Sequence, residues 1–197
     1  MITYIATLDE TDNTGMFTIS LVEDPAVETN WLKFNKDKFN FNIEDEEQRI
    51  ITGVVMRADF PIYRNNAEYG EFYIKYDKET LRLMAERYFK NNQQNNINMA
   101  HNSENTTDKV NIYEMYIKNI ERGINPKGFE DIEDGSLMAS FKVNDDKIWE
   151  DIKQGKFKGF SLEGVFNLVK VEETTTDEEK EIMELIEKIN NKLKERK

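Results

Sequence analysis

Short strand-like runs separated by turn residues dominate residues 1–171 of this sequence and most constrain its fold. The runs RIITGVVM and VNIYEMYI are rich in β-branched and aromatic residues, and YGEFYIKY alternates apolar and polar side chains with the period of a half-buried strand. The strands do not alternate regularly with helices, and no glycine-rich phosphate loop follows any of them, which argues against a doubly wound parallel sheet. The sequence therefore predicts an α+β fold built on a mostly antiparallel sheet or barrel.

Helical patterns occur at three places. Residues 77–92 repeat apolar side chains at helical spacing after Asp77, a suitable N-cap, and residues 145–155 place Trp149 on an apolar face before a terminal glycine. Beyond these, the pattern of residues 172–197 predicts a charged linker followed by an amphipathic helix. The predicted organisation is a strand-rich domain over 1–171, followed by a linker and helix that either dock elsewhere or fold back onto that domain.

Charge and residue usage exclude several classes of function. The 39 Asp and Glu residues outnumber the 27 Lys and Arg residues, and the formal net charge of -12 would repel a nucleic acid. No cysteine is present, which excludes disulfides and thiolate metal sites, and a single histidine excludes a zinc site of several imidazoles. No signal peptide or membrane-spanning run is apparent. We expect a soluble, intracellular protein without a cofactor and without a nucleic-acid or membrane partner.

The segment KGFSLEG, residues 158–164, raises the question of whether Ser161 is a nucleophile. It fails the G-x-S-x-G elbow of one large hydrolase class, because Glu163 occupies the position of the last glycine and a strand follows instead of a helix. Strand alternation turns Ser161 and Glu163 away from the apolar face that Phe160 marks. A serine there is either simply solvated or, in the right surroundings, catalytic.

Two glycines flank this serine in the same predicted strand. Gly159 and Gly164 indicate a bulge or a place where another backbone comes close, either that of a bound peptide or that of a neighbouring segment. Backbone N–H groups near them are candidates for stabilising an oxyanion.

His101 is the one residue in the chain whose type suits general-base chemistry near neutral pH. In NINMAHN it shares strand alternation with Ile97 and Met99, so we expect its ring to be partly buried on their face. A histidine in such a place is either a hydrogen-bonded core residue or a catalytic base.

Glu114 is the third unusual residue, because it alternates with Val110, Ile112 and Tyr116 on a face that otherwise looks interior. A buried carboxylate needs a partner. His101 is one candidate, since the segment between their strands is short and the strands are then expected to be neighbours. The alternatives are a Lys or Arg partner, or exposure at a sheet edge.

Convergence of these residues would create a serine protease site. Glu114 would orient the imidazole, His101 would remove the proton of Ser161, and the serine would attack a peptide carbonyl. Glu163 lies two residues from Ser161 on the same face, about 7 Å away, and is the second choice for the acidic member.

Several ordered segments carry a resemblance to a known family. TISLVEDPAV, GVVMRADFPIYR, YGEFYIKY, NMAHN, VNIYEMYI, DGSLMASFKV and IWEDIKQGKFKGFSLEG resemble segments of phage prohead maturation proteases, specifically the XkdF-like serine proteases. The resemblance covers residues 15–171. The histidine of that family matches His101 in NMAHN, and its nucleophile matches Ser161 in GFSLEG. Its third member varies and is histidine in the herpesvirus branch, which the single histidine here excludes.

The resemblance implies a fold similar to the herpesvirus assemblin protease, a largely antiparallel β-barrel flanked by helices. It also implies an endopeptidase that cuts scaffold or core protein, and the capsid protein in some systems, inside an assembling prohead in the host cytoplasm. Relatives in the herpesvirus branch work as dimers, so a homo-oligomer is a further expectation. The competing hypothesis is a catalytically inactive, protease-like scaffold or assembly component of the phage head.

Overall fold

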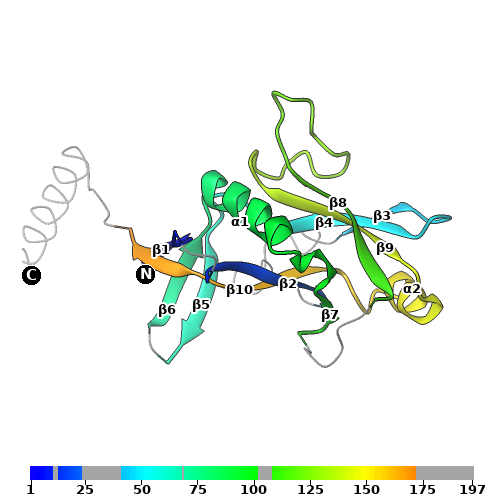
Figure 1. Ribbon diagram of the computed structural model, residues 1–197, viewed down its shortest axis with the longest axis horizontal. Coiled ribbons are helices and arrows are strands. Elements are labelled where there is room, and N and C mark those ends of the chain that lie inside the picture. Colours follow the sequence, from blue (N-terminus) through cyan, green and yellow to red (C-terminus); the bar gives the residue numbers. More distant parts are fainter. Residues whose placement is uncertain (11–12, 24–40, 68, 102–107, 172–197) are drawn as a thin grey trace, which may run out of the picture.

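The computed structural model describes residues 1–10, 13–23, 41–67, 69–101 and 108–171 (Figure 1). Within these ranges the chain is mostly β, with two α-helices and strands in three sheets. The predicted C-terminal helix of residues 172–197 lies outside the described residues.

Each sheet is best defined by its strand order. The first sheet has the order β11-β1-β6-β5 and comprises β1 (Ile2–Thr7), β5 (Ile62–Asn66), β6 (Gly70–Lys75) and β11 (Asn167–Lys170). The second has the order β10-β2-β7 and comprises β2 (Gly15–Val22), β7 (Ile97–Met99) and β10 (Gly159–Val165). The third has the order β3-β4-β9-β8 and comprises β3 (Asn42–Asp45), β4 (Ile50–Met56), β8 (Val110–Ile117) and β9 (Leu137–Val143).

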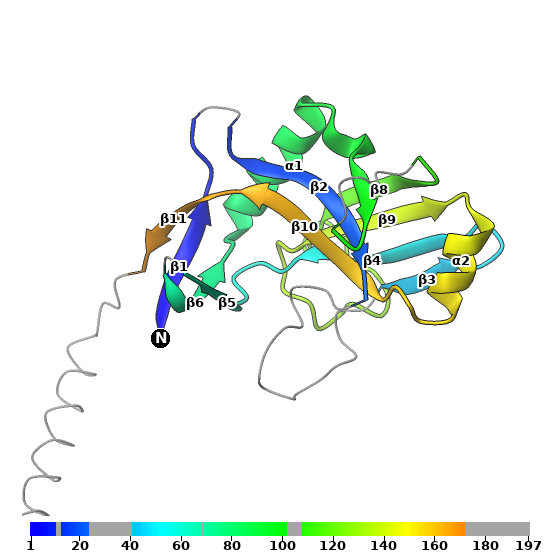
Figure 2. The ribbon, with the colours of Figure 1, turned by 90° about the horizontal axis from the view of Figure 1, so that it is seen from below.

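The predominance of strands, the two helices and the mostly antiparallel pairing agree with the sequence prediction, but the sheets of the described residues do not close into the predicted barrel. Two pairs, β1 with β6 and β2 with β7, are parallel. The strands β10 and β11, separated only by Phe166, run antiparallel to β2 and β1 and so link two sheets (Figure 2). Each sheet therefore ends on edge strands instead of returning to its first strand.

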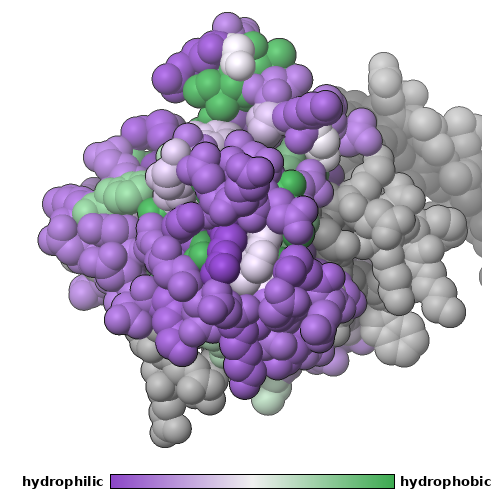
Figure 3. All heavy atoms as spheres, turned by 90° about the vertical axis from the view of Figure 1, so that its right-hand side faces the viewer, coloured by the Kyte–Doolittle hydropathy of each residue, from purple (hydrophilic) through white to green (hydrophobic). Residues whose placement is uncertain are grey.

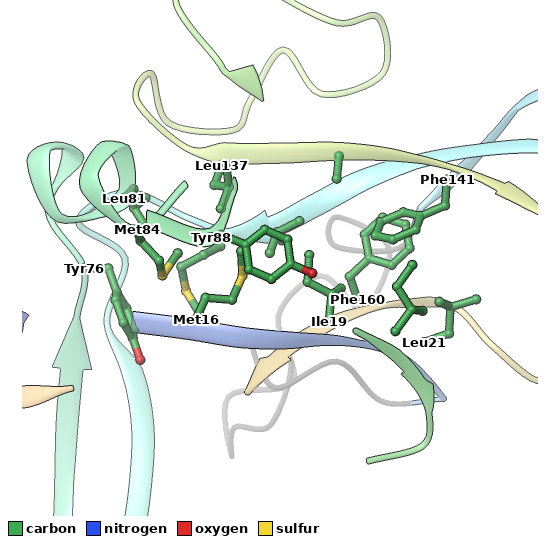
Figure 4. Close-up of a cluster of buried hydrophobic side chains, with 14 of the residues drawn as sticks. Met16, Ile19, Leu21, Tyr76, Leu81, Met84, Tyr88, Leu137, Phe141 and Phe160 are labelled. Carbon is green, nitrogen blue, oxygen red and sulfur yellow. The ribbon is translucent and has the colours of Figure 1, made fainter. Parts of the chain in front are cut away.

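The core lies between β2 and β10 on one side and β4 and β9 on the other, with α1 covering one end (Figure 4). Phe160 of β10 packs against Phe141 of β9, with ring centroids 4.5 Å apart. From β2, Ile19 and Leu21 enter the same core. Burial of these aromatic and aliphatic side chains is the main favourable term that fixes the second sheet against the third.

Both internal helices follow their sequence signals. Helix α1 (Lys78–Lys90) begins after Asp77, whose carboxylate accepts a hydrogen bond from the Thr80 backbone N–H at 2.7 Å. Helix α2 (Asp146–Lys153) is capped in the same way by Asp145, and Gly155 follows it with a φ of 73°. A short 3-10 helix, η1 (Gln93–Asn95), connects α1 to β7. In the described part of the chain, neither α-helix has the length and apolar character needed to cross a bilayer.

The surface at the α2 end of the molecule is mostly hydrophilic (Figure 3). This agrees with a sequence in which 34% of the residues are charged. One lysine behaves differently: Lys118 is fully buried and donates hydrogen bonds to the backbone carbonyls of Phe129, Glu130 and Ile132 at 2.6–3.0 Å. Three carbonyl acceptors satisfy the ammonium group and hold the loop between β8 and β9.

Candidate active site

The pairing of β10, β2 and β7 gathers polar side chains on one face of the second sheet. Ser161 lies directly opposite Ser20, Glu163 lies opposite Thr18, and Ser20 is in register with Asn98 of β7. Residues in register on neighbouring strands share a face. The core side chains occupy the other face, as the strand alternation around Ser161 predicted.

Four of the polar side chains on this face form one hydrogen-bond cluster, defined here as the Ser20–Asn98–His101–Glu163 cluster. The Oγ atom of Ser20 lies 2.6 Å from Oδ1 of Asn98 and 2.7 Å from Oε1 of Glu163. The Nδ2 atom of Asn98 donates to Oε1 of Glu163 at 3.0 Å. The Nδ1 atom of His101 lies 2.9 Å from the same Oε1 and 3.3 Å from Oγ of Ser20.

His101 reaches this cluster because the backbone leaves the strand conformation after β7. Ala100 and His101 have φ values of 54° and 57°, in the left-handed region that non-glycine residues rarely adopt. The prediction that His101 shares the face of Ile97 and Met99 is therefore wrong: two successive left-handed residues break the alternation and put its ring on the Asn98 side. The side chain is 46% exposed.

The left-handed turn at residues 100 and 101 is energetically unfavourable. Each such residue costs about 1 kcal/mol relative to an ordinary conformation, and strained backbone of this kind is concentrated at functional sites. Because of this turn, the His101 side chain is accessible to solvent and also contacts Glu163. A regular strand would not place the ring on this face.

The hydrogen bonds of the cluster stabilise the ionised form of Glu163. Partial burial raises the pKa of this carboxyl, but the hydrogen bonds from Ser20, Asn98 and His101, together with the charge of His101, outweigh the burial and lower the pKa below its usual value. Glu163 is therefore an ionised, acceptor-only group near neutral pH.

Ser161 lies beside the cluster without joining it. It is only 3% exposed, so it is not the solvated serine that the sequence left as an alternative. Among the described residues, the hydrogen bonds of the His101 ring go to Glu163 and Ser20 and not to Ser161. Its position opposite Ser20 keeps its hydroxyl on the face of the cluster.

Glu114 lies elsewhere, and the prediction that its strand neighbours that of His101 is wrong. Strand β8 belongs to the third sheet and β7 to the second. A bulge between Ile112 and Glu114 changes the alternation, so that Glu114 is exposed and accepts a hydrogen bond from Ser140 at 3.2 Å. The carboxylate that contacts His101 belongs to Glu163, the second choice for the acidic member.

The two glycines of KGFSLEG have different surroundings. Gly159 is buried at the start of β10 and pairs with Val22. Gly164 lies at a bulge, where a Cβ atom would overlap the carbonyl oxygen of Gly15 on β2. The backbone that approaches Gly164 closely is thus a neighbouring strand of the same chain, which was one of the two sequence alternatives.

Sequence reasoning missed Ser20 and Asn98. Ser20 sits in the apolar run TISLV and Asn98 in NINM, where their polarity is the only local signal. The hydrogen bonds of Ser20 and Asn98 to Glu163 depend on pairing between strands that are more than 60 residues apart in the sequence. No local pattern encodes such pairing. No group of three or more His, Asp or Glu side chains suited to a metal ion occurs among the described residues.

Replacing Gly164 with alanine should lower the free energy of unfolding by about 2 kcal/mol, because the new Cβ has backbone as its neighbour and the strands must separate to admit it. Urea denaturation measures the change. Val165→Ala, at an adjacent residue that is 56% exposed, is the matched control and should change stability little. Equal stability of the two variants would contradict the close approach.

The carboxyl of Glu163 should titrate with a midpoint below its ordinary pKa of 4.5. Because the folded-state pKa is lowered, the cluster stabilises the fold above that ordinary value and loses this contribution as the pH falls through the folded-state pKa. Carboxyl ¹³C NMR measures the midpoint, and His101→Ala should raise it by removing one donor and one charge. A wild-type midpoint at or above 4.5 would show that the hydrogen bonds do not hold the carboxylate.

Comparison with known families gives one match. The family described as "Putative phage serine protease XkdF" matches residues 39–170, a range that contains His101, Ser161 and Glu163. No curated protein and no solved structure matched the chain. Since the family match covers well over half of the 197 residues, the chain belongs to the XkdF family of phage serine proteases.

Proposed function

We propose that this protein is a serine endopeptidase of phage head assembly, with Ser161 as nucleophile, His101 as general base and Glu163 as the residue that orients the imidazole. The observation that carries the proposal is the distance of 2.9 Å between Nδ1 of His101 and Oε1 of Glu163. Glu163 lies on the same strand and the same face as Ser161. Family membership supports the reaction class.

The reaction follows from the protonation of the imidazole. An ionised Glu163 accepts the hydrogen on Nδ1, which leaves the lone pair on Nε2 of His101. Nε2 takes the proton of Ser161 as its Oγ atom bonds to the peptide carbonyl carbon, and then delivers that proton to the amine nitrogen as the C–N bond breaks. Water, deprotonated by the same Nε2, then bonds to the acyl carbon, and Nε2 returns the proton to Oγ of Ser161 as the ester C–O bond breaks.

The geometry favours Ser161 over Ser20 as the nucleophile. The Ser20 hydroxyl contacts Nδ1 of His101 at 3.3 Å, the nitrogen whose hydrogen Glu163 accepts, so this nitrogen has no lone pair for a serine proton. Ser161 is the other serine on the face, directly opposite Ser20. The exposed His101 side chain must move to bring Nε2 to Ser161, and catalytic hydrogen bonds often form only in the substrate complex.

The proposed substrates are the scaffold or core protein of the phage and the capsid protein, cut inside the assembling prohead in the host cytoplasm. Backbone N–H groups near Gly159 are the proposed donors to the oxyanion. The formal net charge of -12 argues against a nucleic-acid partner, and a homo-oligomer is a further proposal from the resemblance to herpesvirus proteases.

Processing of the scaffold protein should depend on the proposed triad and not on Glu114. In co-expression with the scaffold protein of the same phage, Ser161→Ala and His101→Ala should reduce cleavage at least about 10³-fold, and Glu163→Gln about 10²-fold or more. Glu114→Gln, a matched change on another sheet, should leave cleavage intact. Gel analysis and mass spectrometry of the fragments measure these effects.

A fluorophosphonate probe identifies the nucleophile directly. The adduct should lie on the peptide that contains Ser161 and should disappear in His101→Ala. Full processing by Ser161→Ala, or an adduct on Ser20, would refute the assignment.

One observation favours the competing function of an inactive, protease-like assembly component. Ser161 is 3% exposed and lacks a hydrogen bond to the His101 ring among the described residues. If the wild-type protein neither processes scaffold nor accepts the probe, yet is needed for head assembly, this function replaces that of the endopeptidase.

A further inference from the structure

We propose that Ser20 and Asn98 are positioning residues that hold the carboxylate of Glu163 against Nδ1 of His101 and thereby select the imidazole tautomer that works as a base. The inference deepens the proposed function and rests on it for its catalytic consequence. Ser20 lies outside the range of the family match, which begins at residue 39.

Burial makes these two side chains rigid supports. Ser20 is fully buried and Asn98 is 2% exposed, whereas the side chain of Glu163 is 37% exposed. Polar groups removed from water must find partners inside the protein, and the partners here are each other and Glu163. Ser20 also lies on the central strand of the second sheet, with β10 on one side and β7 on the other.

The donors and acceptors of the cluster fit only one arrangement of the Asn98 amide. Its Nδ2 group faces Oε1 of Glu163 at 3.0 Å, and its Oδ1 atom faces Oγ of Ser20 at 2.6 Å. The reverse orientation would place two acceptors, Oδ1 and the ionised Oε1, against each other. The single hydroxyl hydrogen of Ser20 holds Oε1 in place when it is donated to Glu163, and Nδ2 of Asn98 donates to the same oxygen.

This arrangement determines where His101 carries its hydrogen. Oε1 of Glu163 is an acceptor at 2.9 Å from Nδ1, so a neutral imidazole is most stable with the hydrogen on Nδ1 and the lone pair on Nε2. Without Ser20 and Asn98, the half-exposed Glu163 side chain is free to adopt other rotamers. The neutral ring then also populates the form with hydrogen on Nε2, which is unable to accept the proton of Ser161 through that nitrogen.

Asn98, which positions Glu163, and His101, the proposed base, lie in the same short segment of the chain. Asn98 precedes His101 by three residues, and the left-handed turn at Ala100 and His101 brings the ring back over the face of Asn98. A single short segment therefore supplies one support of Glu163 and the group that Glu163 orients.

The test uses the full chain with Ser20→Ala and Asn98→Ala, and with Ser140→Ala as the matched control. Ser140 is also a buried strand serine bonded to a glutamate, Glu114, but it lies in the third sheet. Because the chain has one histidine, imidazole ¹⁵N NMR reports His101 without ambiguity. Circular dichroism and thermal melting establish that each variant is folded.

The wild type and Ser140→Ala should show the neutral ring protonated at Nδ1. Ser20→Ala and Asn98→Ala should shift the ring several-fold toward the Nε2-protonated form, and kcat for scaffold cleavage should fall about 10- to 100-fold with KM unchanged, because the supports act through another residue. Unchanged tautomer populations in both folded variants would overturn the proposal.

The two proposals fail in different ways. A tautomer shift in a protein that lacks peptidase activity would refute the proposed function and leave the positioning role standing. A fluorophosphonate adduct on Ser20 in the wild type would overturn the positioning role, because Ser20 would then be the nucleophile.

Discussion

The antiparallel pairing of β2 with β10 is the interaction on which the rest of this structure depends. One face of the pair sends Ile19, Leu21 and Phe160 into the core, where Phe160 packs 4.5 Å from the ring of Phe141. The other face carries Ser161 and Glu163. A shift of register by one residue would exchange the two faces, so the packing of the core also fixes the position of the polar residues. Stability and site geometry thus have one cause.

The parallel addition of β7 to the same pair converts a polar face into a candidate active site. It places Asn98 beside Ser20 and delivers His101 through a turn with two left-handed residues. The strain of that turn is offset by the packing of β7 and by the hydrogen bonds of the cluster. This distribution, with local strain held by a stable surrounding sheet, is the usual way in which a fold maintains a functional geometry.

Local patterns in the sequence predicted the parts of the structure that depend on local physics. Asp77 caps its helix because an N-cap needs only its own first turn, and Ser161 alternates with Phe160 because the strand is regular there. The predicted faces of His101 and Glu114 were wrong because a left-handed turn altered the alternation at His101 and a bulge altered it at Glu114. Local patterns did not predict the hydrogen bonds of Ser20, Asn98 and the buried Lys118. Long-range pairing or loop closure brings their partners near, and no short window of sequence contains that information.

The bulges also explain why Glu163, and not Glu114, faces the histidine. In β8 the bulge precedes Glu114 and leaves it exposed beside Ser140, in a sheet that does not contain β7. In β10 the bulge follows Glu163, so the regular alternation from Ser161 to Glu163 is intact and the irregularity is absorbed at Gly164, where no side chain has room. A carboxylate two residues from a serine in a regular strand necessarily shares its face. The chain's single histidine therefore needs only to reach that face, and the turn after β7 is what allows it to do so.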